Sequence, residues 1–365
     1  MAIRNRGLFS IALEGDEGVL VLTPAEGAEN EIKTVEACDD LDVTADEIGN
    51  ITGTIDNATN WVDDLMRVGD SLDKSAIAGV GIDEVSLEPT MIAVEAICYK
   101  LGLESMMVFP SLESFKSPST RIISTHVVVE KIGDTVKKAK DTIVRLFKAL
   151  IEKMKELGKK FMEVMMNVIP RHLKSLEKRI EALPESKEAL EIHDKGLIRA
   201  FGKKGQTKVT IQDVEKVLTF PERLKDLSDK VDSIDGNLLY NSVIKDGVII
   251  RQNDEVSDSA TIEVANKDQM KVALELIRKY AKISADMKIV LAKAEKDCTE
   301  LMRESESRDK KEPNSANKEL KEAFSLRAKE ASLHQKLVQL YILTAKEGIK
   351  YIERCITARK GGDKK

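Results

Sequence analysis

The chain has 365 residues with a net charge of −5, and 33% of them are charged, 42% hydrophobic and only 4% aromatic. This length suits two or three domains of ordinary size, and the apolar content excludes a wholly disordered chain. Abundant charge with few aromatic side chains is typical of long helices that have aliphatic seams and solvated outer faces.

The first 119 residues contain two candidate helices between less regular stretches. Residues 1–60 mix a short β-like run with acidic, Gly- and Thr-containing segments, which predicts loose order. Candidate helices follow at Thr59–Leu72 and Pro89–Leu103. The segment Phe109–Ser119 contains two prolines and several serines, so we expect the main linker of the chain there.

A long amphipathic helix is predicted after this linker. Apolar residues recur at three- and four-residue steps from Val127 to Val168, and lysines occupy much of the other face. Pro170 is expected to end this run because proline cannot continue a helix from its interior. A second helical piece is predicted at Arg171–Leu190.

The remainder predicts a small insertion followed by a helical hairpin. Within residues 196–262, short strands at 208–211 and 247–251 flank a helix at 214–220, which indicates a small α+β insertion. Two long helices then close the chain at Lys267–Arg303 and Lys318–Arg359. A polar stretch separates them, so an antiparallel hairpin packed as a coiled coil is expected. The fold class is therefore mainly α.

The net charge conceals a strong division along the chain. Residues 1–115 carry 23 acidic and 6 basic side chains, a net of −17, and the remainder carries a net of +12. The sign changes at the predicted linker. Such asymmetry indicates different partners for the two parts, or one part that masks the other, although charged helix faces are often only solvated surface.

No residue pattern indicates catalysis or a cofactor. Phosphate-binding loops, zinc-protease motifs and nucleophile elbows are absent from the sequence. Cys38, Cys98, Cys298 and Cys355 lie far apart without metal-ligand spacing, so we interpret them as reduced, buried thiols. We expect no catalytic residue, no metal, no cofactor and no enzymatic activity.

The lysine-rich helix at 131–169 allows two interpretations. Its phenylalanines and methionines suit an interfacial membrane helix, but such a stripe more often packs against a neighbouring helix, and core packing is favoured. Its cations suit non-specific contact with DNA phosphates or another anionic surface. The candidate contacts are Lys137, Lys138, Lys140, Arg145, Lys148, Lys153, Lys155, Lys159 and Lys160.

The region Ser86–Arg121, which contains EPTMIAVEAICYKLGLESMMVFPSLESFKSPSTR, and the lysine-rich helix after it resemble internal head proteins of large tailed bacteriophages. The resemblance covers residues 86–170. In that family a prohead protease removes an acidic N-terminal propeptide by cutting after glutamate, two positions beyond a small or aliphatic residue. Tripeptides that match end at Glu113, Glu104 and Glu14, and only Glu113 coincides with both the linker and the change of charge.

The resemblance implies a structural protein packaged inside the phage head with the DNA and possible ejection with the genome. Its expected partners are the prohead protease, non-specifically bound DNA and other head proteins, and its expected location is the virion interior after assembly in the host cytoplasm. The chain would divide into an acidic propeptide-like region at 1–113, a linker with lysine-rich helices at 114–195, the insertion at 196–262 and the hairpin at 263–365.

Two other functions remain open from the residues alone. The amphipathic helix at 131–169 fits a membrane-associated or membrane-perturbing protein with transient membrane contact. The C-terminal hairpin fits a cytoplasmic coiled-coil adaptor, which would form a discrete oligomer and would not be processed at Glu113.

Overall fold

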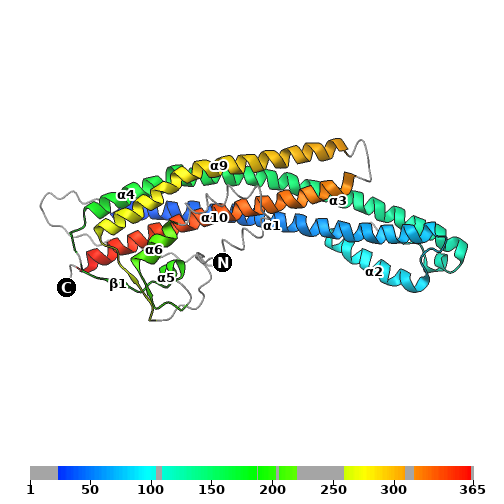
Figure 1. Ribbon diagram of the computed structural model, residues 1–365, viewed down its shortest axis with the longest axis horizontal. Helices are drawn as coiled ribbons and strands as arrows, with labels where there is room; N and C mark the ends of the chain where they lie inside the picture. The colour runs from blue at the N-terminus through cyan, green and yellow to red at the C-terminus, as the bar shows by residue number, and fades with distance from the viewer. Residues whose placement is uncertain are drawn as a thin grey trace.

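The computed structural model describes residues 24–103, 109–186, 188–202, 205–219, 259–308 and 316–362. Long helices run along the length of the molecule and pack side by side (Figure 1). Their buried side chains form one contiguous hydrophobic core. The predicted mainly α fold with a small α+β part is confirmed. The long helices are α1 (Pro24–Ile77), α3 (Pro118–Glu163), α9 (Lys267–Arg308) and α10 (Ala316–Gly362).

Helix α1 packs chiefly along α3 and α10. Its buried apolar residues recur at alternating three- and four-residue steps, which places them on one face of the helix. The expectation of loose order over residues 1–60 is therefore wrong from Pro24 onward, while residues 1–23, including the β-like run at 19–22, lie outside the described residues. The buried face includes Cys38, Leu41, Ala45, Ile48, Ile55, Val62, Leu65 and Leu72.

Buried threonines explain why this face is hard to recognise in the sequence. Thr52 and Thr59 are 5% and 3% exposed and occupy core positions between the apolar residues. Their hydroxyls donate to the carbonyl oxygens of Gly49 at 2.9 Å and Ile55 at 2.7 Å. Because each hydroxyl is satisfied within its own helix, the side chain can be buried without an unpaired polar group.

Helix α2 (Glu84–Lys100) begins before the predicted start at Pro89. Asp83 caps it by accepting a hydrogen bond from the Ser86 amide at 2.7 Å, as aspartate commonly does at a helix N-terminus. The predicted linker then contains a short 3₁₀ turn, η1 (Leu112–Phe115), and α3 begins within the linker at Pro118. The predicted linker thus contains regular structure at Leu112–Phe115 and from Pro118 onward.

The lysine-rich helix continues past the residue that was expected to end it. Helix α3 leads into a π-helical turn, η2 (Val164–Val168), and directly into α4 (Ile169–Glu181). Pro170 lies in the first turn of α4. A π turn ahead of a proline accommodates the missing N–H and the bulk of the ring, so the run bends without breaking. The second predicted helical piece ends at Glu181, nine residues earlier than expected.

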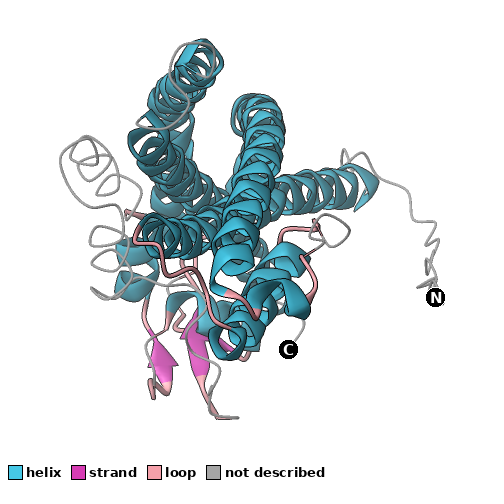
Figure 2. Ribbon diagram, turned by 90° about the vertical axis from the view of Figure 1, so that its right-hand side faces the viewer, coloured by secondary structure: helices cyan, strands magenta, loops and turns pink. Residues whose placement is uncertain are grey.

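The predicted insertion forms a small α+β unit beside the long helices, visible as strands at one side of the bundle in Figure 2. Strand β3 (Thr261–Glu263) lies between β1 (Glu191–Ile192), which is antiparallel to it, and β2 (Lys208–Val209), which is parallel. Helices α5 (Lys195–Phe201) and α6 (Ile211–Leu218) complete the unit. The predicted strand at 247–251 and Phe220 lie outside the described residues.

The predicted C-terminal hairpin is present, because α9 and α10 pack against each other. The two helices extend beyond their expected ends, to Arg308 and from Ala316. Edge-to-face ring contacts fix α10 in the core: Phe324 meets Phe147 of α3 with ring centroids 4.6 Å apart, and Tyr341 meets Tyr280 of α9 at 6.5 Å. Coiled-coil packing and the four-part division of the chain stay predictions.

Replacement of Leu41 by alanine tests whether α1 is a core helix. Leu41 is fully buried, so the substitution leaves a cavity and should reduce the free energy of unfolding by about 2–5 kcal/mol. Val43→Ala is the matched control on the same helix, because Val43 is 58% exposed and should change stability by no more than about 0.5 kcal/mol. Urea denaturation of the full chain measures both, and equal effects would contradict the packing of α1.

Candidate functional site

Carboxylates of α1 meet lysines of α3 and α10 along the contact between these helices, and we call this contact the acidic–basic interface. It joins the two parts of the chain that have opposite net charge. Its ion pairs are Asp40 with Lys160, Glu47 with Lys153, Asp39 with Lys346 and Asp56 with Lys329.

Two lysines of α3 make the densest contacts of the acidic–basic interface. Lys160 lies 2.9 Å from a carboxylate oxygen of Asp40 and donates to the Thr44 hydroxyl at 2.9 Å. Lys153 lies 2.6 Å from Glu47. Glu156 bridges the two lysines, at 2.9 Å from Lys153 and 3.0 Å from Lys160. These contacts hold α3 against α1 in one register.

The same contacts shift the ionisation of the groups involved. Hydrogen bonds to Glu47 and Glu156 raise the pKa of Lys153, and the hydrogen bond to Asp40 is the main cause that raises the pKa of Lys160. The Lys153 and Lys160 ammonium groups lower the pKa of Glu156. All three side chains therefore hold their charged forms more strongly, as opposite charges within hydrogen-bond distance require.

Polar contacts continue the interface onto α10. Lys346 lies 2.6 Å from Asp39, and the Gln339 amide donates to Asp46 at 2.9 Å. The Ser325 hydroxyl donates to Asp56 at 2.6 Å. These contacts run from Asp39 to Asp56 of α1, so the acidic helix is bound to α10 as well as to α3.

A buried polar chain ties the beginning of α1 to α4 and α10. His172 of α4 is 1% exposed; its Nδ1 lies 2.9 Å from the Thr34 hydroxyl and its Nε2 lies 2.9 Å from a Glu353 carboxylate oxygen. Arg179 lies 3.7 Å from the same oxygen. Because Glu353 is 7% exposed, these neighbours offset the cost of burying its carboxylate. No local sequence pattern indicates this chain of contacts.

The structure does not bring the nine predicted cations into one patch. Lys153 and Lys160 belong to the acidic–basic interface, while Lys155 turns toward α9, where it lies 3.8 Å from Glu295. Lys140 is half-buried, and the other predicted cations lie exposed along α3. The exposed members are Lys137, Lys138, Arg145, Lys148 and Lys159. A polyanion could therefore reach part of the predicted set directly.

Among the three candidate cleavage positions, only Glu113 lies within the described residues. Ser111, directly before the 3₁₀ turn, and Glu113 within it are exposed, and Leu112 is 47% exposed. Phe115 is fully buried, and its carbonyl accepts a hydrogen bond from Arg121 at 3.0 Å. The tripeptide that ends at Glu113 is thus accessible on a turn anchored directly after it. Glu104 and Glu14 fall outside the described residues.

The described residues hold no group of three or more His, Cys, Asp or Glu side chains placed to bind a metal ion. All four cysteines are buried and unpaired with one another. Burial raises the thiol pKa to about 12 for Cys38 and Cys298 and to about 11 for Cys355. Such thiols are poor nucleophiles near neutral pH. Within the described part of the chain, no helix is long and apolar enough to cross a membrane.

A family model of phiKZ-like phage internal head proteins matches residues 27–246, more than half of the chain, from the first turn of α1 to beyond α6. No curated protein and no solved structure matches the chain.

Replacement of Glu156 by glutamine tests the electrostatics of the interface. The folded pKa of this carboxyl is lowered, so its contribution to stability is present above its ordinary pKa of 4.5 and is lost as the pH falls through the folded value. Glu156→Gln should therefore lower the urea midpoint at pH 7 and lower it by a smaller amount at pH 3. Glu130→Gln, at an exposed position of α3, is the control and should have little effect at either pH. If Glu156→Gln lowered the urea midpoint by the same amount at pH 3 as at pH 7, the ion pairing of Glu156 would be contradicted.

Proposed function

The chain belongs to the phiKZ-like phage internal head proteins, and on this premise we propose that it is packaged with the genome after the prohead protease cuts its acidic N-terminal region at Glu113. As a member of this family it is a structural protein of the phage head interior, which argues against an enzyme. Beyond family membership, we propose that the chain contacts DNA, that it is cut at Glu113 and that the prohead protease is its partner.

The observation that carries the proposal is the pairing of acidic α1 with basic α3 and α10. Lysine and arginine side chains bind DNA phosphates without regard to sequence and release the counterions condensed on the DNA. In the full chain, carboxylates of α1 already neutralise Lys153, Lys160 and Lys346. The net charge of −17 over residues 1–115 also repels DNA. An intact chain is thus suited to assembly with other head proteins before DNA enters, and loss of the acidic region would leave a basic product.

Comparison with a second tripeptide of the same sequence supports a cut at Glu113. Ser175, Leu176 and Glu177 repeat the sequence of the tripeptide that ends at Glu113, but they lie within α4. Leu176 is fully buried, and Glu177 pairs with Arg278 of α9. A protease needs an accessible, extendable segment, so the turn at Glu113 is a better substrate than the helix.

A cut at Glu113 would not by itself separate the acidic region from the rest. The buried face of α1 and the acidic–basic interface both hold it to α3 and α10. We therefore expect the cut to produce a nicked bundle whose acidic part leaves only when the bundle opens. Ejection with the genome would require such opening too, because the long side-by-side helices must unfold to pass a narrow tube.

The two alternative functions gain no specific support. The apolar stripe that a membrane helix would need is buried in the bundle: Phe147 and Phe161 are fully buried and Met154 is 2% exposed. The C-terminal hairpin that an adaptor would present packs against α1 and α3. In the full chain, therefore, both the apolar stripe of α3 and the C-terminal hairpin are occupied by core packing.

Paired substitutions in the phage test the cleavage. Glu113→Gln should leave the chain at full length in mature heads, because the protease requires glutamate before the cut, whereas Glu177→Gln should not alter processing. Mass spectrometry of proteins from mature heads measures this, and the unaltered chain should give a product that begins at Ser114. If mature heads instead contain the uncleaved chain, with peptides from residues 24–103 at full abundance, the proposal is contradicted.

A further inference from the structure

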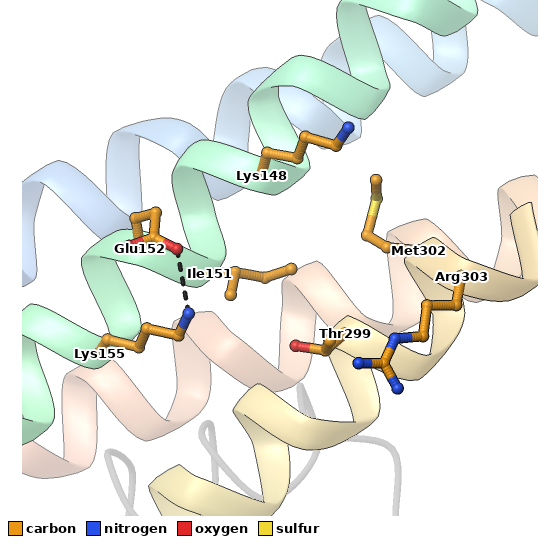
Figure 3. Close-up of a pocket in the computed structure, with 7 residues that line it drawn as sticks. All are labelled: Lys148, Ile151, Glu152, Lys155, Thr299, Met302 and Arg303. Carbon is orange, nitrogen blue, oxygen red and sulfur yellow. Dashed lines mark hydrogen bonds and ion pairs between the residues drawn. The ribbon is translucent and has the colours of Figure 1, made fainter. Parts of the chain in front are cut away.

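A pocket of about 300 Å³ lies between α3 and α9, away from the acidic–basic interface (Figure 3). Helix α3 contributes one stripe at three- and four-residue spacing, and α9 contributes one turn. The lining residues are Lys148, Ile151, Glu152, Lys155, Thr299, Met302 and Arg303. The stripe of α3 that faces α1 is a different one, formed by Lys153, Glu156 and Lys160. The acidic helix therefore does not cover this pocket.

The pocket lining carries an excess of positive charge. Three cationic side chains line it with one carboxylate, that of Glu152. Glu152 accepts a hydrogen bond from Lys155 at 3.0 Å, and Glu295 lies 3.8 Å from the same ammonium group. Lys148 and Arg303 add two further positive charges from opposite walls, and both are exposed. An entering anion would thus meet cations from both helices.

Apolar side chains form the floor of the pocket. Ile151 points from α3 toward α9 in Figure 3, and it is 7% exposed. Met302 of α9 is 4% exposed. Because these buried apolar side chains replace solvent on one side of the charged groups, the effective dielectric constant is lower there than on an open surface and attraction to an anion is stronger. The Thr299 hydroxyl already donates to the Glu295 carbonyl at 2.8 Å, which leaves the cations to bind the anion.

We propose that this pocket binds a phosphate group between Lys148, Lys155 and Arg303. The planar guanidinium of arginine matches two phosphate oxygens, and the lysine ammonium groups act as point charges beside it. The volume of about 300 Å³ has room for a phosphate group or a small phosphate compound such as pyrophosphate, but not for a nucleic-acid helix. The phosphate is either one residue of a DNA backbone that lies across the α3–α9 groove or a free phosphate compound. The DNA source rests on the proposed function, whereas the site itself does not.

Two double variants of the full chain test the pocket. Lys148→Ala with Arg303→Ala removes two charges from opposite walls of the pocket, and Lys137→Ala with Arg145→Ala removes two exposed charges from α3 outside it. All four side chains are exposed, so both proteins should fold, and matching thermal unfolding would confirm this. Pyrophosphate is the probe for free phosphate, measured by calorimetry, and a 20-base-pair duplex is the probe for DNA, measured by fluorescence anisotropy against salt.

We expect the pocket variant to bind pyrophosphate at least about tenfold more weakly than the unaltered chain, because each lost cation removes a direct contact. The control should change less than about twofold. If DNA uses the pocket, the slope of log affinity against log salt should also fall by about 1 in the pocket variant, since one phosphate contact is lost. If the pocket variant binds pyrophosphate more weakly but shows an unchanged salt dependence of DNA binding, the site is assigned to free phosphate, and DNA contact there is contradicted. Equal losses of pyrophosphate affinity in the pocket variant and the control, or no loss in either, would overturn the proposal.

Discussion

The bundle depends on the burial of one face of α1 against α3 and α10. This face carries residues such as Leu41, Ile48 and Leu65, all fully buried in the core shared by the long helices. Fully burying such side chains contributes about 1.5–3 kcal/mol each, which exceeds what exposed ion pairs add. The ion pairs at the edges of the face then fix which lysines the acidic helix covers. Charge thus sets the register of a contact that apolar burial stabilises.

This arrangement gives the charge division of the chain a physical meaning. The acidic residues of α1 do not lie on a tail separate from the basic part of the chain. They lie on a helix that is part of the core and that forms ion pairs with the basic helices α3 and α10. The acidic helix therefore shields basic residues in the intact chain, as the proposed assembly before DNA entry requires. If the proposed cut at Glu113 occurs, it would change the connectivity of the chain before it changes its charge. Opening of the bundle would then be the step that exposes Lys153 and Lys160.

The sequence predicted some elements well because their cores are aliphatic. Phe147, Leu150 and Met154 stand out at helical spacing, so the long lysine-rich helix was evident, as was the C-terminal hairpin. Helix α1 was predicted only at Thr59–Leu72, and its earlier part was missed because threonines take core positions in it. A threonine whose hydroxyl bonds a carbonyl of its own helix can be buried, although it reads as polar in the sequence. Pro170 led to the opposite error: the helix was predicted to end there, but a π turn before it allows the helical path to continue.

Long-range pairing lay beyond sequence reasoning for a different reason. Asp40 and Lys160, or Lys148 and Arg303, come together only through the order in which the helices pack, and no local pattern encodes that order. Glu113 lies exposed in a segment rich in proline and serine, and its role as a cleavage position stays a prediction. The anchoring of that segment by the buried Phe115 depends on the fold and has no local signal.

Hydrogen exchange measured by mass spectrometry on the full-length protein tests the central claim most directly. If α1 is a core helix, backbone amides at residues 38–72 should exchange as slowly as those at residues 128–161 of α3, because both become accessible only when the bundle opens. Exchange of residues 38–72 at the rate of an unstructured peptide, with residues 128–161 still protected, would contradict the account.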